Sequence, residues 1–510
     1  MSTIRKIDSK YILNNKILKY LIVGFSLFTT FLCWSVSSPL GSAPDDAFHA
    51  AQIWCSNGPS PQSCETISKN GDVYTVRTPY ISPSCFWNPV LQNASCTTSK
   101  DHETEQVISF GKSDYPRGMY RLMHFFVSNN PVRSVLQMRI FSGFLATVIM
   151  LAILLLSPRK LRFAFVISWL PVLTPHGFFF ISSINPTGWS FLSIATNWTF
   201  LYLLLSEIKI SNLRSRRIAL ISVFYLVTLL VGLSSRWDSR IFLIITSAVT
   251  FLIVNQQRKW LKMSHLIAFV TSFAAFVIIL ARQNYRIRSS LTLSSGGNSS
   301  GFNSLQYFIY LLVHLIEFPI GVFGVDTAWG GLGGLYPSTP PMVGYIGFSI
   351  AICTIAIACI KLNRIQFVSS SILMLTIFGA VYQQQNVNRF LVGDMVAPRY
   401  IMGMVAVLIG VVTLTSTSDE SFLFTKHFKI VGIIGLGTAQ SVALYSNMDR
   451  FITFGLGTTG TFKGFNQTGR WWWNTSISPY VVWALGTASF VLFLISAWGV
   501  CAPRASHETI

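Results

Sequence analysis

Apolar stretches of about 20 residues recur along the chain and are separated by shorter polar segments. An α-helix needs a stretch of this length to cross the hydrocarbon core of a bilayer, and the polar segments between them are typical of surface loops. The pattern predicts an all-α, polytopic membrane protein with about twelve transmembrane helices. The predicted spans lie near residues 18–38, 136–157, 163–181, 188–206, 218–234, 240–255, 264–281, 342–360, 367–382, 400–416, 430–446 and 480–500.

Basic clusters fall on alternate connections between these stretches and indicate the orientation of the chain. The clusters are IRKIDSK, SPRKLR, KISNLRSRR, QQRKWLK and IKLNR. Because Lys and Arg accumulate on the cytoplasmic side, we expect a multi-pass plasma-membrane protein with both termini in the cytoplasm. The first stretch has an alternative interpretation as a cleaved signal peptide, but it is longer than a typical signal core.

This orientation divides the chain into six parts. They are a cytoplasmic N-terminus with the first helix (1–38), an outer loop with an acidic motif and four cysteines (39–134), helices two to seven (135–281), an outer loop with an interfacial helix (282–341), helices eight to twelve with outer loops at 383–399 and 447–479 (342–500), and a cytoplasmic tail (501–510).

The composition supports this class. Of the 510 residues, 51% are hydrophobic and 11% are charged, which excludes an ordinary soluble globular protein. Lys and Arg outnumber Asp and Glu by 38 to 18, but the excess lies in the short connections. We therefore expect these charges to set topology and to contact membrane lipids, and we expect no nucleic acid partner.

Four cysteines, Cys55, Cys64, Cys85 and Cys96, lie in the first outer loop. An oxidising face favours two disulfides, and four free thiols are the alternative. Three pairings are open, of which Cys55–Cys64 and Cys85–Cys96 close the shortest loops.

The apolar segment LQYFIYLLVHLIEF lies in the second outer loop and carries polar residues at helical spacing. These residues are Gln306, Tyr310, His314 and Glu317. One polar face predicts a helix that lies in the interface or re-enters from outside, rather than a full span. His314 and Glu317 are candidate substrate-binding residues.

Two adjacent acids, Asp45 and Asp46, follow the first span in the motif APDDAFH. Neighbouring carboxylates repel, and at a low-dielectric membrane edge this raises the pKa of one of them toward that of a general base. His49 follows at helical spacing, so in a helix it shares their face, where it positions an acceptor, contacts a metal or caps the site. The alternative interpretation is helix capping by acids at a positive helix end.

Arginines at the predicted outer ends of the spans depart from the positive-inside pattern. They are Arg236, Arg240, Arg282, Arg286, Arg288, Arg389, Arg399 and Arg450. A guanidinium suits phosphate oxygens, so the group predicts binding of a lipid phosphate; snorkelling to ordinary headgroups is the alternative.

Among these arginines, Arg399 is the strongest candidate, because Pro398 places it and Tyr400 at a helix N-terminus. Arg236 and Arg389 are further candidates for the phosphate. Asp238 is positioned to orient Arg236 or a sugar hydroxyl, and Asn185 in INPTGW marks either a turn or a binding residue.

These groups suit sugar transfer from a polyprenyl phosphate. A leaving phosphate needs cations rather than a dedicated acid, and one carboxylate then suffices to deprotonate the acceptor hydroxyl. On this hypothesis one of the two aspartates is the base, and the other orients it or helps to hold a divalent cation. No other cofactor is required.

The motifs APDDAFH, NPTGW, SSRWDS, FGVD and APRY occur in an order that resembles a family of bacterial membrane proteins related to the GT-C glycosyltransferases. The resemblance implies a GT-C-like fold, a polyprenyl-phosphate sugar donor, and an envelope glycan, lipid or protein as acceptor. It also implies that Asp45 is the general base, with Arg399 and Tyr400 at the donor phosphate. The commoner acid motif of that family is Asp-Glu, so the shorter Asp46 departs from it.

A transporter or lipid-linked sugar flippase is the main alternative. Such proteins commonly place ionisable groups near the membrane midplane, often in repeated halves. Here the polar groups concentrate at the predicted outer face, which favours the enzyme.

Overall fold

The computed structural model describes most of the predicted membrane part and portions of the loops. The described residues are 2–58, 64–66, 73–77, 94, 107–111, 115–207, 216–258, 304–314, 317–324, 339–388, 397–414, 425–452, 465, 471–473 and 475–501.

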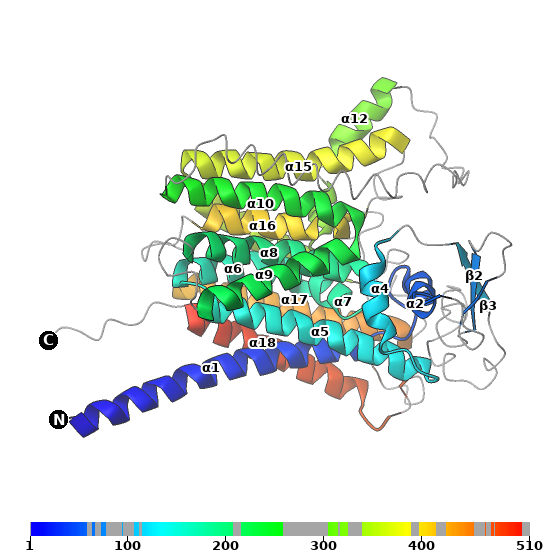
Figure 1. Cartoon of the computed structure of the whole chain (residues 1–510), viewed down its shortest axis with the longest axis horizontal. Coiled ribbons are helices and arrows are strands. Elements are labelled where there is room, and N and C mark those ends of the chain that lie inside the picture. Colours follow the sequence, from blue (N-terminus) through cyan, green and yellow to red (C-terminus); the bar gives the residue numbers. More distant parts are fainter. Residues whose placement is uncertain are drawn as a thin grey trace.

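Long helices lie side by side in a bundle (Figure 1). Within the described residues, nine segments are long and apolar enough to cross a membrane. They belong to α1 (Ser2–Val36), α5 (Pro131–Leu156), α6 with η3 and α7 (Arg159–Ile181), α9 (Arg216–Ser235), α10 (Trp237–Arg258), α14 (Pro341–Cys359), α15 (Arg364–Asn388), α17 (Lys426–Ile452) and α18 (Pro479–Cys501). The prediction of a polytopic membrane protein is confirmed.

The other three predicted spans differ from these nine. Two of them coincide with α8 (Pro186–Glu207) and with the shorter apolar helix made by η4 (Pro398–Ile401) and α16 (Met402–Thr413). The third, 264–281, lies outside the described residues. A count of twelve therefore stays a prediction.

Helix α8 is polar for a membrane helix because it is enclosed by protein. Its Ser193 hydroxyl donates to the carbonyl of Thr228 at 2.6 Å, and Asn197 donates to the Thr228 hydroxyl at 3.0 Å, both on α9. Ser190 accepts from Ser239 of α10 at 2.6 Å. Such bonds between helices satisfy polar groups that lipid would leave unpaired.

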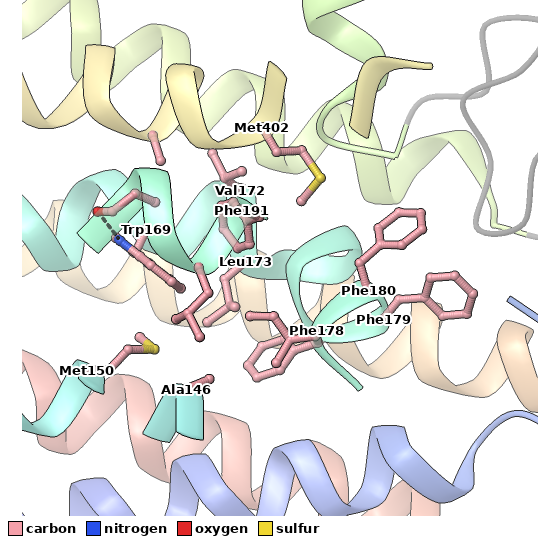
Figure 2. Close-up of a cluster of buried hydrophobic side chains, with 14 of the residues drawn as sticks. Ala146, Met150, Trp169, Val172, Leu173, Phe178, Phe179, Phe180, Phe191 and Met402 are labelled. Carbon is pink, nitrogen blue, oxygen red and sulfur yellow. Dashed lines mark hydrogen bonds between the residues drawn. The ribbon is translucent and has the colours of Figure 1, made fainter. Parts of the chain in front are cut away.

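The centre of the bundle is formed by α6 (Arg159–Val172), α8 and α16, which pack against one another. Large side chains from these helices and from α5 interlock there, including Met150, Trp169, Phe191 and Met402 (Figure 2). The Trp169 indole donates to the carbonyl of Ala195 at 3.0 Å, so its only polar atom is satisfied.

Proline is the first residue of five helices. In α5, α8, α14, η4 and α18 the chain enters the helix at Pro131, Pro186, Pro341, Pro398 and Pro479. The first turn tolerates proline because its N–H would have no helical partner, and the ring presets φ. These starts agree with the sequence prediction to within a few residues, except at α5, which begins earlier.

One predicted span, 163–181, is interrupted. Helix α6 contains Pro171 and continues into a π-helical turn, η3 (Leu173–Gly177), in which Thr174 has non-helical angles. The short helix α7 (Phe178–Ile181) follows, and Figure 2 shows Phe178 turned away from Phe179 and Phe180. Proline removes a backbone hydrogen bond and commonly causes such a break.

The end of the bundle that carries α2 (Asp46–Trp54) also carries α4 (Arg117–His124) and a three-stranded antiparallel sheet, and we call it the α2 end (Figure 1). The strands are β1 (Glu65–Thr66), β2 (Val73–Arg77) and β3 (Val107–Gly111), in the order β1-β2-β3. The all-α prediction is therefore right for the bundle and wrong for the first outer loop, where short alternating runs form strands.

Helix α12 (Ser304–His314) lies beside one end of α15 in Figure 1, and the short α13 (Glu317–Gly321) packs against η4. The described part of α12 has 11 residues, fewer than the about 20 that a membrane span needs. Gln306 is exposed on it, and Tyr310 is half-buried. The side chains of His314 and Glu317, the predicted substrate-binding residues, lie outside the described residues.

Candidate functional site

The acidic motif forms the connection between α1 and α2. Asp45 precedes α2 with φ 61° and ψ 11°, a left-handed conformation that few residues other than Gly, Asn and Asp adopt. Its side chain makes no capping hydrogen bond. A capping hydrogen bond therefore does not explain Asp45, whose side chain is 56% exposed.

Arg399 faces this carboxylate from η4. Its Nη2 lies 3.4 Å from Asp45 Oδ2 and 3.4 Å from the Tyr400 hydroxyl. Both distances are long for hydrogen bonds to a guanidinium. Arg399 Nε has no hydrogen-bond partner among the described residues, and the side chain is only 13% exposed beside the Phe180 ring. Arg399 therefore keeps donor capacity for an anion.

Arg236 lies in the same cluster but is already paired. It binds Asp238 through two nitrogens, at 3.0 Å from Nε to Oδ1 and 2.8 Å from Nη2 to Oδ2. Its guanidinium carbon lies 3.8 Å from the centre of the Tyr400 ring, and its Nη1 is 3.5 Å from the Tyr115 hydroxyl. Arg236, oriented by Asp238, thus packs against the Tyr400 ring and holds it in place. Because Arg236 is already paired with Asp238, it has less donor capacity for the predicted direct contact to a phosphate.

His49 is buried on α2 and accompanies aromatic side chains. Its Nδ1 lies 2.8 Å from the hydroxyl of Tyr120 on α4, and the ring packs edge-on against Tyr115. Burial, with the nearby Arg236 and Arg399, lowers the pKa of His49 to about 3. His49 is therefore neutral at physiological pH and anchors α2 to α4.

The titration of His49 predicts a stability change with pH. The pKa of His49 is about 3 in the folded protein, below the usual 6.5. Neutral His49 therefore contributes fully to the free energy of unfolding above pH 6.5, and this contribution is lost as the pH falls from 6.5 toward 3. Between pH 7.5 and pH 5.0 we expect the free energy of unfolding of the wild type to fall by about 2 kcal/mol relative to His49→Asn. Urea unfolding of both proteins in detergent at each pH measures this difference; a difference that does not change with pH contradicts it.

Asp46 occupies an environment unlike that of Asp45. It is fully buried and pairs with Arg139 of α5, with 3.3 Å between Oδ2 and Nη2, and its Oδ2 also accepts from the amide of Ala43 at 3.3 Å. Burial raises the pKa of Asp46 to about 6, and the Arg139 charge opposes this. The sequence interpretation missed Arg139, although a lone charge close to an apolar run was a usable signal.

A divalent cation does not fit Asp46. The guanidinium of Arg139 lies against the same carboxylate and would repel such an ion. Moreover, across the described part of the chain no three His, Cys, Asp or Glu side chains are grouped so as to hold a metal. The residues present thus disfavour the metal role considered for Asp46 and His49.

Asn185 connects the acidic motif to the bundle. Its amide nitrogen donates to the carbonyl of Pro44 at 2.7 Å, and its oxygen accepts from the amide of Thr187 at 2.9 Å, in the first turn of α8. Asn185 is therefore both a turn residue and a support of the residue just before Asp45. Its side chain is 2% exposed overall, which disfavours direct substrate contact.

The remaining predicted site residues are placed only in part. A disulfide joins Cys55, at the end of α2, to Cys64. Cys85, Cys96 and Arg389 lie outside the described residues. The residues that the fold brings together are thus Asp45, Arg399, Tyr400, Arg236, Asp238 and His49.

Comparisons with known proteins give one match. Curated proteins yield none, and no solved structure matches. The family described as "Predicted membrane protein (DUF2142)" matches residues 28–435, which include the acidic motif and Arg399. Since the match covers well over half of the chain, the protein belongs to this family of membrane proteins.

Proposed function

We propose that the protein is an inverting membrane glycosyltransferase that moves a sugar from a polyprenyl-phosphate donor to a hydroxyl of a cell-envelope glycan, lipid or protein. The reaction takes place at the α2 end of the bundle, on the outer face of the plasma membrane. Asp45 is the general base, and Arg399 binds the donor phosphate.

The facing pair of Asp45 and Arg399 is the observation that carries this proposal. The pair joins an exposed carboxylate that makes no capping bond to a guanidinium that keeps unused donor capacity. Their contact of 3.4 Å is long enough that a substrate phosphate can compete for the arginine.

The reaction follows from these two roles. The acceptor hydroxyl gives its proton to the Asp45 carboxylate while its oxygen forms a bond to the anomeric carbon. The bond between that carbon and the phosphate oxygen breaks, and the phosphate leaves with the electron pair. Arg399 stabilises the negative charge that develops there, so no separate acid is needed. Attack from the side opposite the phosphate inverts the anomeric centre.

The surroundings of the pair suit an amphipathic donor. Arg399 lies in η4, which leads into the apolar helix α16, and α16 packs against α6, α8, α14 and α15. On this proposal the polyprenyl chain stays in the bilayer outside the bundle and only the phosphate reaches the start of η4, where the helix dipole also favours an anion.

Arg399→Ala tests the donor site. We expect the KM for the donor to rise at least tenfold, because a charge-assisted contact to phosphate is lost, while the KM for the acceptor changes less than twofold. The measurement uses purified protein in liposomes, polyprenyl-phosphate mannose, glucose or arabinose labelled in the sugar, and envelope from a deletion strain as acceptor.

Arg240→Ala is the matched control, since Arg240 lies at the start of α10 and stacks on Trp237 rather than facing Asp45. It should leave the donor KM unchanged. If both substitutions raised the donor KM equally, Arg399 would be a residue that contacts lipid headgroups in general and not a specific donor-binding residue. Movement of the lipid-linked sugar across the bilayer, without label entering the acceptor, would instead identify a flippase.

A further inference from the structure

Arg139 binds four oxygen atoms around the connection that leads to the acidic motif. Its Nη1 donates to the carbonyls of Ser35 at 3.2 Å and Ser38 at 2.7 Å. Its Nη2 donates to the carbonyl of Pro39 at 3.0 Å and to Asp46 Oδ2 at 3.3 Å. One side chain thus satisfies the carbonyls at the end of α1 and also holds the residue that begins α2.

The same turn is held from the other side by α17 and by the last loop. Asn447 donates to the carbonyl and hydroxyl of Ser37 at 3.0 and 3.1 Å, and to the hydroxyl of Ser38 at 2.8 Å. The indole of Trp473 donates to the carbonyl of Val36. Elements distant in the chain therefore converge on the backbone that precedes Asp45.

We propose that Arg139 is a positioning residue for Asp45 and that Asp46 is the buried partner of Arg139 rather than a second reacting acid. This inference rests on the proposed function, because it assigns Asp45 the role of general base in that reaction and Asp46 a structural role.

The conformation of Asp45 explains why its backbone must be held by surrounding residues. Since its carboxylate makes no capping bond, the direction of the carboxylate depends on its backbone, which is held in a left-handed conformation. Residues in that region keep their conformation only where the surroundings determine it. Asn185 holds Pro44, and Arg139 adds to this by binding Pro39 earlier in the connection and Asp46 directly after Asp45.

The burial of Arg139 and Asp46 indicates that they do not contact the substrates directly. The side chains of Arg139 and Asp46 are 1% and 0% exposed, so neither reaches a donor or an acceptor in the open part of the site. A loss of Arg139 should therefore act on the orientation of Asp45, and hence on kcat, without changing affinity for the donor.

The test compares Arg139→Gln, Arg139→Lys and Asp46→Asn in the liposome transfer assay. For Arg139→Gln we expect kcat to fall at least 100-fold, with the donor KM within twofold of the wild type. Arg139→Lys keeps the charge beside Asp46 but offers fewer directed donors, so we expect a tenfold loss of kcat. For Asp46→Asn we also expect about a tenfold loss, because Arg139 still holds the carbonyls.

The control is Arg133→Gln, an exposed arginine on the same helix, which should behave as the wild type. Equal loss from Asp46→Asn and Asp45→Asn would overturn the inference, because Asp46 would then take part directly. A rise in donor KM for Arg139→Lys as large as its loss of kcat would also overturn it.

A second measurement is independent of activity. Hydrogen exchange of the amides of His49, Ala50 and Ala51, where the hydrogen-bonded part of α2 begins, should be at least tenfold faster in Arg139→Lys than in the wild type. If the wild type transfers no sugar, the proposed function fails while the positioning role is still measured. If exchange is unchanged, the positioning role fails whatever the activity.

Discussion

Asp45→Asn is expected to abolish sugar transfer while the protein stays folded in the membrane. An amide cannot accept the proton of the acceptor hydroxyl, so the rate should fall by about 10²- to 10⁴-fold. Folding should be spared, because Asn adopts the left-handed conformation as readily as Asp and no capping bond is lost. The change in the free energy of unfolding should be within about 0.5 kcal/mol.

The measurement combines mass spectrometry of envelope glycans from a complemented deletion strain with the liposome transfer assay. Glu207→Gln is the control, because Glu207 is an acid of similar size at the far end of α8, paired with Arg217. It should transfer sugar normally. A well-expressed, active Asp45→Asn protein would remove Asp45 from the role of base.

Gly188→Ala is expected to have the largest effect on folding. A Cβ at this position in α8 would lie 2.2 Å from the carbonyl oxygen and 2.6 Å from the carbonyl carbon of Phe180, and 2.8 Å from the nitrogen of Ile181. These are backbone atoms of α7, so α7 and α8 must move apart. Overpacking typically costs about 1–3 kcal/mol, and the absence of a flexible side chain that can move aside favours the upper end of that range.

The displacement should also reach the site, because the Phe180 ring lies beside Arg399. We therefore expect Gly188→Ala to lower the thermal unfolding temperature of the purified protein and to weaken donor binding. Gly379→Ala on α15 is the matched control, since an added Cβ there meets no atom within 4 Å. Alanine favours a helix over glycine by about 1 kcal/mol, so the control should be neutral or slightly stabilising. Equal behaviour of the two variants would contradict the close contact.

Several features of the site could be predicted from local patterns. Asp45 follows an apolar run and precedes a helix, and Arg399 follows a proline that begins one, so both residues could be placed at helix ends. Charged groups also concentrate at helix ends at the membrane surface, because they remain hydrated there. Local pattern did not distinguish the two aspartates, because their difference in burial depends on what packs over them.

Most contacts within the site could not be predicted, because they join residues that are far apart along the chain. Asp46 meets Arg139 across 93 residues, and Asp45 meets Arg399 across 354. No periodicity or spacing encodes such contacts, since they depend on how helices pack. The pairing of Arg236 with Asp238 is different, because the two lie two residues apart and the motif SSRWDSR predicts that Asp238 can orient Arg236.

The sequence by itself determined that the chain is a membrane protein of many helices, because each apolar run is long enough to satisfy its own backbone hydrogen bonds in lipid. It also determined where most helices begin, through proline and the limits of the apolar runs. Only the tertiary structure decided which acid is exposed, which arginine faces it and which polar side chains join helices. Those properties depend on burial and on partners from distant helices, and both arise only when the bundle is assembled.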